Sequence, residues 1–410
     1  MQKGDNNLIN STNKINVLNV LWKETSVSKA EIANRTNLSV PTVMKIMNEL
    51  SEKGLVNEIG KGASSGGKRP IMLEFNRHAY YVIGVDINEY WTEVVLVNLL
   101  LGIEEKRIQD IRTTDNEHSV IQRVIREIYT ILELHPQKRE RIIGIGIGVQ
   151  GLIDSKRGVV VHSSEMNWHN VNIKDAFKEF FDGEIMVEEA TRAMASAEKR
   201  IGYARDVDNF LYVNIGYSIG SAIVTNGKLY YGSNKSSGRL GHMVVEKNGT
   251  PCNCGNYGCL EQYASGNAIE RIAKERLHKN ADSQIYDLVF GNPEKVDAYI
   301  VFEAAKNGDD FAINILSDAA DYLGIVISGV INLMDPQLVI FGGKVCRTGE
   351  IYMNLFQEIL KKRHVKYAEG RIRIADSKED RNFASIGAAT FVFERFVERG
   401  GEFRKLLKCL

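Results

Sequence analysis

The chain has 410 residues, more than one hydrophobic core usually supports, so two or three compact lobes are expected. Lysine plus arginine and aspartate plus glutamate both number 52, and hydrophobic residues make up 44%. This composition excludes a disordered or fibrous protein, and it excludes DNA binding through overall positive charge. Any contact with DNA must come from a local patch.

The sequence favours a cytoplasmic location without membrane insertion. No apolar run approaches the ~18 residues needed to span a bilayer, and the first residues lack the apolar core of a signal peptide. Three of the five cysteines lie within eight residues, at positions 252–259. This clustering favours metal ligation in a reducing compartment over disulfides.

Two helices are predicted near the start of the chain. Apolar residues recur at helical spacing over 13–24, which indicates an amphipathic helix. Ser28 and Glu31 then form the pattern of a capping box, in which each side chain accepts a free amide of the first turn. A short helix over about 29–35 is expected to follow.

A third helix is predicted over about 40–53. Ser39 is a good N-cap, and Pro41 is tolerated in the first turn, where amides lack partners within the helix. Gly54 suits the left-handed position that ends many helices. The buried face is expected to carry Val43 and Leu50, and Lys45 is expected to face outward.

Two strands complete an N-terminal domain over 1–76. Residues 55–59 and 71–75 alternate as strands do, and a Gly/Ser-rich segment joins them. The order helix, helix, turn, helix, hairpin is typical of a winged helix-turn-helix, whose recognition helix enters the major groove of DNA. A helical hairpin domain that binds protein is the alternative. Residues 1–75 hold ten Lys/Arg and seven Asp/Glu, a mild positive charge that permits phosphate binding.

The residues expected to contact DNA fall into two groups. The exposed start of the third helix is predicted to read bases, and the basic residues of the wing are predicted to contact phosphates or the minor groove. The first group is Ser39, Val40, Pro41, Thr42 and Lys45, and the second is Lys61, Lys68 and Arg69.

From about residue 80 the sequence alternates between strand and helix signals, which indicates an α/β body. Three apolar runs each lead into a glycine-containing loop, at 142–149, 210–216 and 338–343. Loops of this kind expose backbone amides at strand ends and often hold phosphate or sugar oxygens.

Two segments of the body carry a family signature. Residues 241–245 read Gly-His-Met-Val-Val, and residues 252–261 read Cys-Asn-Cys-Gly-Asn-Tyr-Gly-Cys-Leu-Glu. They resemble the signature of the ROK family (repressors, open reading frames and kinases), and shorter motifs follow in that family's order and spacing. The resemblance covers nearly all of residues 80–395. With its winged helix, the whole chain is similar to the repressor branch, which includes xylose and N-acetylglucosamine repressors.

The resemblance implies a two-lobed body with the actin/hexokinase-like (ribonuclease H-like) fold. The first lobe is expected over 77–195, completed by a C-terminal helix at about 383–410. The second lobe is expected over 196–382 and contains the clustered cysteines.

One histidine and three cysteines form a candidate zinc site: His242, Cys252, Cys254 and Cys259. One nitrogen and three thiolates make a closed tetrahedral set, which zinc favours, and a closed set leaves no position for a substrate. We therefore expect a structural zinc ion. The alternative is that these are free thiols.

The resemblance also implies a sugar site between the two lobes, formed by Gln150, Gly151, Glu189, Arg239, His242 and Glu261. Arg239 stands where the family's Gly-Glu-x-Gly-His motif has its glutamate. Because arginine only donates hydrogen bonds, this change alters which sugar oxygens can be recognised. The sugar therefore stays open, with xylose as the candidate that the resemblance suggests. A buried ion-pair cluster of Glu189, Arg239 and Glu261 is the alternative.

Three departures from the family's kinases predict that the chain is not an enzyme. The position of the catalytic aspartate aligns with Ala190, so the general base is missing. The first phosphate loop carries Asn88 and Glu89 in place of glycines, and the second carries Tyr217 in place of a small hydroxyl residue.

These features predict a transcriptional repressor of sugar-utilisation genes. A homodimer or homotetramer would present two winged domains to a palindromic operator, and a sugar that prefers the released state would act as inducer. One alternative is a body that binds a protein partner in place of a sugar. A more distant alternative is an active ATP-dependent sugar kinase.

Overall fold

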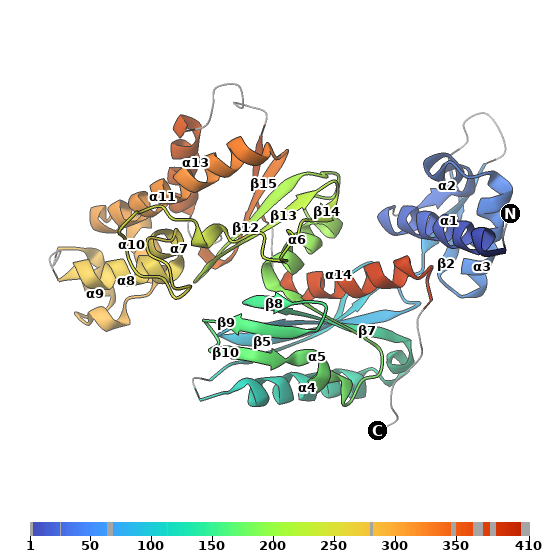
Figure 1. Cartoon of the computed structure of the whole chain (residues 1–410), viewed down its shortest axis with the longest axis horizontal. Coiled ribbons are helices and arrows are strands. Elements are labelled where there is room, and N and C mark those ends of the chain that lie inside the picture. The colour runs from blue at the N-terminus through green and yellow to red at the C-terminus, as the bar shows by residue number, and fades with distance from the viewer. Residues whose placement is uncertain are drawn as a thin grey trace. The chain divides into compact units, whose positions relative to one another are not determined.

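The computed structural model describes residues 3–24, 26–63, 69–112, 114–278, 282–345, 350–363, 372–377 and 383–402. The chain divides into two compact units (Figure 1). Unit 1 comprises Met1–Arg200 and Asn382–Leu410, and unit 2 comprises Ile201–Arg381. Residues 1–76 are not split off as a separate unit. The predicted fold class, an α/β body with an N-terminal winged helix-turn-helix, is confirmed.

Unit 1 begins with the winged helix-turn-helix. The first helix starts about ten residues earlier than predicted, and a two-residue strand that the sequence did not reveal joins the hairpin in a sheet of order β1-β3-β2. The elements are α1 (Lys3–Lys23), β1 (Val27–Ser28), α2 (Lys29–Thr36), α3 (Val40–Glu52), β2 (Val56–Lys61) and β3 (Ile71–Phe75).

The predicted helix caps are confirmed. Ser28 and Glu31 form the capping box of α2, with each side chain accepting the other residue's backbone amide. Ser39 caps α3 by accepting the amide of Thr42 at 3.3 Å. Gly54 follows α3 with a φ of 69°, the left-handed conformation that favours glycine.

The rest of unit 1 is the first lobe, whose five-stranded sheet has the order β11-β7-β4-β5-β6. Figure 1 shows α14 on one face of this sheet and α4 on the other. Its larger elements are β4 (Tyr81–Ile87), β5 (Trp91–Asn98), β6 (Ile103–Asp110), α4 (Glu117–Leu134), β7 (Ile142–Val149), β11 (Glu184–Glu189), α6 (Ala190–Ile201) and α14 (Phe383–Glu398). The smaller ones are η1 (Pro136–Arg141), β8 (Leu152–Asp154), β9 (Val159–Ser163), β10 (Trp168–Asn172) and α5 (Ile173–Lys178).

Helix α14 lies unusually close to the sheet. A Cβ atom on Gly146 of β7 would lie 2.0 Å from the carbonyl oxygen of Ala388, and one on Gly84 of β4 would lie 2.1 Å from that of Ser385. The glycines therefore allow the backbones to pack directly. The strands β4 and β7 and the helix α14 are far apart in the sequence. The first lobe is therefore complete only when α14 packs on its sheet.

Unit 2 has a second five-stranded sheet, of order β14-β13-β12-β15-β16. Its strands are β12 (Phe210–Ile215), β13 (Ile219–Thr225), β14 (Lys228–Leu229), β15 (Leu338–Gly342) and β16 (Arg373–Asp376). Its helices are η2 (Leu240–His242), α7 (Glu261–Ala264), α8 (Gly266–Leu277), α9 (Gln284–Leu288), η3 (Pro293–Lys295), α10 (Ala298–Lys306), α11 (Asp310–Met334) and α13 (Glu350–Arg363).

Helix α11 is long and apolar enough to cross a membrane by length and composition alone. In unit 2 its buried side chains, among them Ile315, Leu323 and Ile327, pack into the hydrophobic core against α13 and the sheet. This packing accounts for the apolar composition of the helix.

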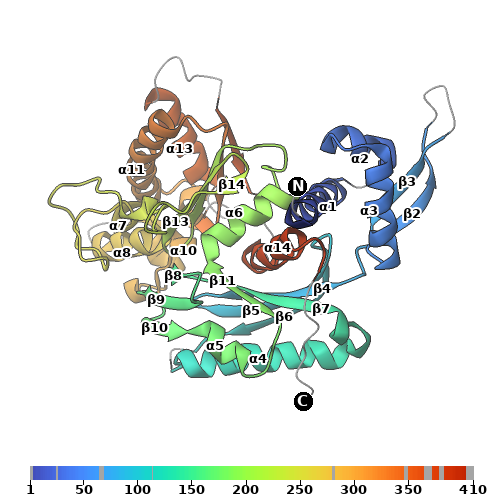
Figure 2. The same ribbon diagram turned by 45° about the vertical axis from the view of Figure 1, so that its right-hand side comes forward.

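The winged helix-turn-helix and the first lobe share one hydrophobic core. Leu18 and Leu21 of α1 belong to the same buried cluster as Phe393 and Phe396 of α14, and Figure 2 shows the two helices side by side. At the edge of this cluster the indole nitrogen of Trp22 donates to the carbonyl oxygen of Leu99 at 2.9 Å. The winged domain is therefore packed onto the lobe through apolar side chains.

The end of α6 adds a charged contact to this packing. The guanidinium of Arg200 lies 4.0 Å from the centre of the Trp22 ring, within the range of a cation–π interaction. Arg200 also donates to Glu394 of α14 at 3.0 Å. One side chain thus joins α6, α14 and α1.

Candidate functional site

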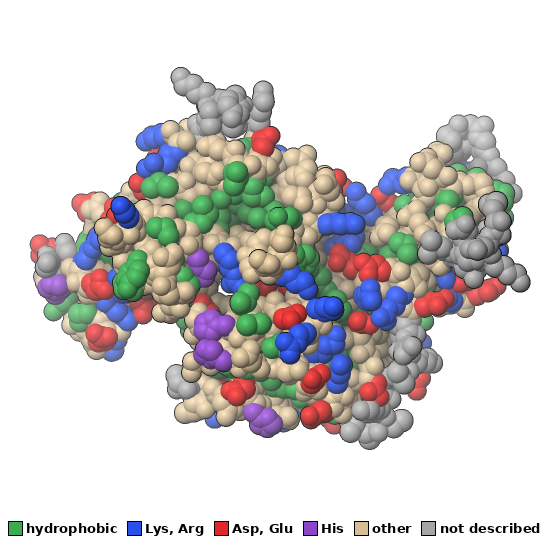
Figure 3. Space-filling model, viewed as in Figure 1, with side chains coloured by type: hydrophobic (Ala, Val, Ile, Leu, Met, Phe, Trp, Pro, Cys, Tyr) green, Lys and Arg blue, Asp and Glu red, His purple; other side chains and the backbone are tan. Residues whose placement is uncertain are grey.

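The predicted DNA-contacting residues lie on α3 and the wing. Four of the five residues predicted to read bases are exposed, and Thr42 is half-buried; the exposed ones are Ser39, Val40, Pro41 and Lys45. Lys61 of β2 and Arg69 are also exposed, whereas Lys68 lies outside the described residues. Positive and negative side chains are interspersed on the face drawn in Figure 3.

Two of the predicted base-reading residues have a role within the helix cap. The hydroxyl oxygens of Ser39 and Thr42 lie 2.8 Å apart and share a hydrogen bond, and the Ser39 hydroxyl also accepts the Thr42 amide. These hydroxyl groups stabilise the start of α3 before any base is present. Their assignment as base readers remains a prediction.

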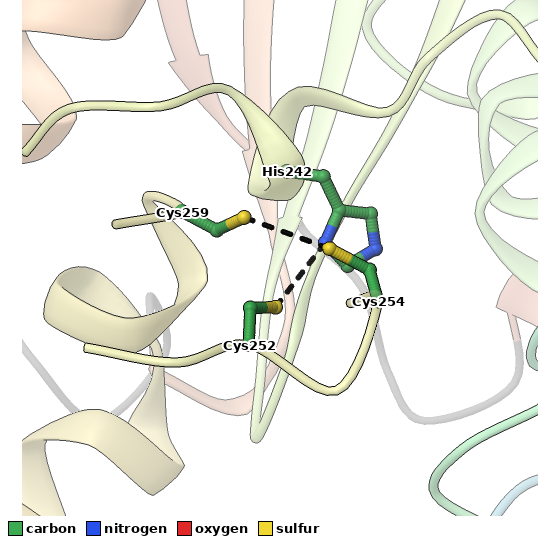
Figure 4. Close-up of side chains that lie close together, drawn as sticks. All are labelled: His242, Cys252, Cys254 and Cys259. Atoms are coloured by element: carbon green, nitrogen blue, oxygen red, sulfur yellow. Dashed lines mark hydrogen bonds between the residues drawn. The ribbon is translucent and has the colours of Figure 1, made fainter. Parts of the chain in front are cut away.

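The four predicted metal ligands come together in unit 2. Figure 4 shows His242, Cys252, Cys254 and Cys259 pointing toward one another, and their ligand atoms all lie within 4.8 Å of one another. Cys254 Sγ and Cys259 Sγ are 3.7 Å apart. Zinc–sulfur bonds of about 2.3 Å in a tetrahedron place two sulfurs about 3.8 Å apart, so the donor set fits this ion.

Short loops hold these ligands in place. Isolated β-bridges join Val244 with Cys259 and Pro251 with Tyr257. Gly258 has a φ of 70°, and a Cβ atom there would lie 1.7 Å from the carbonyl oxygen of Glu246. Only glycine fits this position, so the backbone that carries Cys259 is fixed by close packing.

Burial and hydrogen bonds together shift the pKa values of the three thiols in different directions. It raises the pKa of Cys252, and together with hydrogen bonds from the neighbouring thiols it raises the pKa of Cys259 to about 12. At Cys254 burial also acts upward, but a hydrogen bond from the Asn256 amide and the neighbouring thiols lower the pKa overall. A cation that binds here must displace protons from Cys252 and Cys259.

The predicted sugar-binding residues are divided between the two units. Gln150, Gly151 and Glu189 belong to unit 1, and Arg239, His242 and Glu261 belong to unit 2. Gly151 has a φ of 131°, and a Cβ atom there would lie 2.6 Å from the carbonyl oxygen of His162. This close approach requires glycine whether or not a sugar binds.

Glu189 caps the helix that follows it. Its two carboxylate oxygens accept the amides of Thr191 and Arg192, each at 3.0 Å, and so satisfy the free N-terminus of α6. Burial is the largest influence on this group and raises the pKa of Glu189, despite these hydrogen bonds and the nearby charge of Arg192. Ala190, predicted to align with the family's catalytic aspartate, is the buried first residue of α6.

Replacing Glu189 with glutamine should change how stability depends on pH. Because the pKa of Glu189 is raised in the folded protein, its contribution to stability is largest below the pKa of an unfolded glutamate, about 4.3. That contribution is lost as the pH rises through the raised value. Chemical denaturation across this window should show a smaller loss with rising pH in Glu189→Gln than in the wild type.

The exposed Glu179→Gln is the matched control for this change. Glutamine keeps one carbonyl oxygen for the amides of α6 and replaces the other acceptor with an NH2 donor, so the cap is weakened while the titration disappears. An identical pH dependence in Glu189→Gln and in the control would contradict the assignment.

The residues predicted for the sugar in unit 2 have different surroundings. Glu261 begins α7, and its Oε2 accepts the amide of Ile219 at 3.0 Å. Arg239 is exposed, and its carbonyl oxygen accepts the amide of His242 at 3.0 Å. Glu261 thus ties α7 to the start of β13, in the same loop region as the four metal ligands.

The loop that corresponds to the first kinase phosphate loop is closed by its own side chain. Asn88 Oδ1 accepts the amides of Tyr90 at 2.9 Å and Trp91 at 3.1 Å, and Asn88 Nδ2 donates to Asp86 at 3.0 Å. In a phosphate loop such amides point at the phosphate. Here they already have an acceptor within the chain.

The loop predicted to correspond to the second kinase phosphate loop borders a pocket that the sequence did not reveal. Tyr217 lies beside Lys344, whose Nζ is 5.4 Å from the ring centre and 3.4 Å from the hydroxyl oxygen. The pocket is an open hollow of about 350 Å³ that includes solvent space, and its walls include Tyr299 and Phe302. Because its wall residues come from several separate segments between Gly216 and Val345, no local sequence pattern could identify them.

Family models match both parts of the chain. The model of the ROK family matches residues 82–395, and the model of the winged helix-turn-helix DNA-binding domain matches residues 11–57. This chain belongs to the ROK family. The match confirms the family resemblance that residues 241–261 indicated.

Individual relatives include both repressors and kinases. The chain is 28% identical over 389 residues to a putative xylose repressor of Caldicellulosiruptor sp. strain Rt8B.4, covering 95% of this chain and 97% of that protein. It is 34% identical over 315 residues to the glucokinase of Thermotoga maritima, covering 77% of this chain and 98% of that enzyme. A ROK family transcriptional regulator, described as a homolog of the Escherichia coli MLC protein, has the same fold, with a TM-score of 0.82, 24% identity and coverage of 96% and 98%.

Proposed function

We propose that this protein is a sugar-responsive, DNA-binding transcriptional repressor without kinase activity. The observation that carries the proposal is the joining of a winged helix-turn-helix to a ROK body within one chain. The putative xylose repressor matches across 97% of its own length, which includes both parts. The T. maritima glucokinase matches only 77% of this chain.

In this proposal the protein acts as at least a dimer on a palindromic operator. The two-fold symmetry of a dimer matches two half-sites one helical turn or a multiple of it apart. The start of α3 reads bases, and Lys61, Lys68 and Arg69 contact the DNA backbone or the minor groove. This arrangement needs no overall positive charge on the protein.

A sugar is the proposed effector, and xylose is the first candidate because of the named repressors. Gln150, Gly151, Glu189, Arg239, His242 and Glu261 are the proposed sugar-binding residues. To release DNA, the sugar must bind the released state more tightly, by several kcal/mol for a nearly complete shift. Zinc held by His242 and the three cysteines is proposed to be structural, because four protein ligands leave no open position.

A sugar kinase is the second candidate function, and the similarity to a glucokinase favours it. Two observations favour the repressor instead. Ala190 offers a methyl group where a general base is needed, and Asn88 occupies the amides that would meet a phosphate. Glu189 does not replace the base, because both of its oxygens cap α6.

A mobility-shift assay with the DNA upstream of the protein's own gene tests the proposal. The full-length protein is expected to retard this duplex and to release it with one member of a panel of pentoses, hexoses and amino sugars. Lys45→Ala should weaken binding, because an exposed cation of α3 is lost. Lys178→Ala, which removes the same charge from α5, is the matched control and should bind as the wild type does.

Three outcomes would contradict parts of the proposal. Absence of any specific shift would remove the DNA-binding function. Binding that is indifferent to every sugar would favour regulation by a protein partner of the body. Transfer of phosphate to a sugar after addition of ATP would favour the kinase.

A further inference from the structure

The recognition helix exposes an apolar edge. Val40 and Met44 of α3 are 47% and 46% exposed, and Asn48, one turn further on, is also exposed. The three residues follow one another at intervals of four, so they lie along one edge of the helix. The adjoining face is used in the core, because Val43 and Met47, three residues after Val40 and Met44, are buried.

This edge is unlike the polar surface expected of a solvated helix. Each of the two apolar side chains could have been polar without affecting the core, since neither packs against it. In a helix-turn-helix the outward face of the second helix enters the major groove. There the apolar feature of a base pair is the C5-methyl group of thymine, and a side-chain amide forms two hydrogen bonds with adenine.

The hydroxyl groups next to this edge are engaged in the N-cap, so the edge itself is the main surface of α3 that can read bases. The hydroxyls of Ser39 and Thr42 are bonded to each other in the N-cap. Lys45 is exposed beside Met44 and carries the charge that attracts phosphates or guanine. Val40, Met44 and Asn48 thus face outward along one edge of α3, and none of them takes part in the N-cap.

We propose that α3 reads a short run of A·T base pairs. Val40 and Met44 pack against thymine methyl groups, and Asn48 hydrogen-bonds to an adenine. From Val40 to Asn48 the helix rises about 12 Å, which corresponds to roughly three or four base pairs at 3.4 Å each. This inference rests on the proposed function and adds the class of sequence that the protein recognises.

Selection of binding sites from a pool of randomised duplexes by the full-length protein gives the first test. Enriched half-sites are expected to contain thymines in the major groove that α3 occupies. Each thymine is then replaced singly by deoxyuridine, which lacks only the methyl group. At a contacted thymine the affinity for the duplex should fall about fourfold, because the complex no longer buries that methyl group.

Met44→Ala tests whether Met44 is the side chain that contacts a thymine methyl group. This variant should bind the thymine duplex more weakly than the wild type, and it should lose the sensitivity to deoxyuridine at one position. Ile9→Ala, which removes an apolar side chain that is 52% exposed on α1, is the control and should keep that sensitivity. Both substitutions lie on the surface, so circular dichroism should show intact folds.

The outcomes distinguish this inference from the proposed function. If no sequence is enriched, the protein is not a sequence-specific DNA-binding protein and both proposals fail. If half-sites are enriched but deoxyuridine is tolerated at every thymine, only the inference is overturned. An equal penalty for deoxyuridine in Met44→Ala and in the wild type would also overturn the assignment to Met44.

Discussion

Cys254→Ser is expected to remove the metal from the purified protein. A serine hydroxyl is a poor zinc ligand, and even the loss of a group that only orients a ligand weakens metal binding by about 10- to 100-fold. Loss of a direct ligand should therefore lower the affinity for zinc by at least about 100-fold. Elemental analysis should find one zinc ion per wild-type chain and much less than one in the variant.

The effect should extend to the local fold. Residues 242–259 contain little regular structure, and Gly258 is packed against Glu246 with no space to relax. Without the ion, amide hydrogen exchange should rise across this segment, because metal binding and folding are coupled in small metal sites. Cys409→Ser is the control for the loss of a thiol. Equimolar zinc retained in Cys254→Ser would show that this residue is not a ligand.

Phe393→Ala is expected to destabilise the winged domain from the opposite end of the chain. Phe393 of α14 is 1% exposed, and its ring centre lies 5.9 Å from that of Trp22 of α1. Truncating a buried phenylalanine costs about 3–5 kcal/mol, and here the cavity would lie in the core shared with α1. Hydrogen exchange should therefore increase in α1 and α3 and not only in α14.

Phe177→Ala is the matched control for this prediction. Phe177 is fully buried in α5, in a separate core cluster that contains no residue of the winged domain. Its truncation should lower the stability of the first lobe by a similar amount and leave exchange in α3 less affected. If hydrogen exchange in α3 rose equally in the two variants, the contact of Phe393 with α1 would not be what stabilises the winged domain.

The sequence was most informative where local chemistry determines structure. The caps at Ser28 and Ser39 use side chains three residues from the amides that they accept, so a short motif predicts them. The early start of α1 and the strand β1 were missed. Residues 3–12 are largely polar and lack an apolar period, and β1 has only two residues whose pairing with β3 depends on tertiary structure.

The same distinction applies to the sites. The four metal ligands lie within 18 residues, and their types and spacing were enough to predict that they come together. The pocket beside Tyr217 and Lys344 joins residues that are 127 positions apart, so it became visible only in the fold. The role of Glu189 as a helix cap was also hidden, because the sequence alone did not place the start of α6 at Ala190.

The core shared by α1 and α14 has a consequence for the order in which the protein can mature. Residues of the winged domain leave the ribosome long before α14, but Leu18 and Leu55 are covered by Phe396 and Gly401 near the end of that helix. The apolar surface of the winged domain therefore stays exposed until α14 has been synthesised. A chain cut before α14 would display a winged domain with an incomplete core, so firm docking of that domain depends on α14.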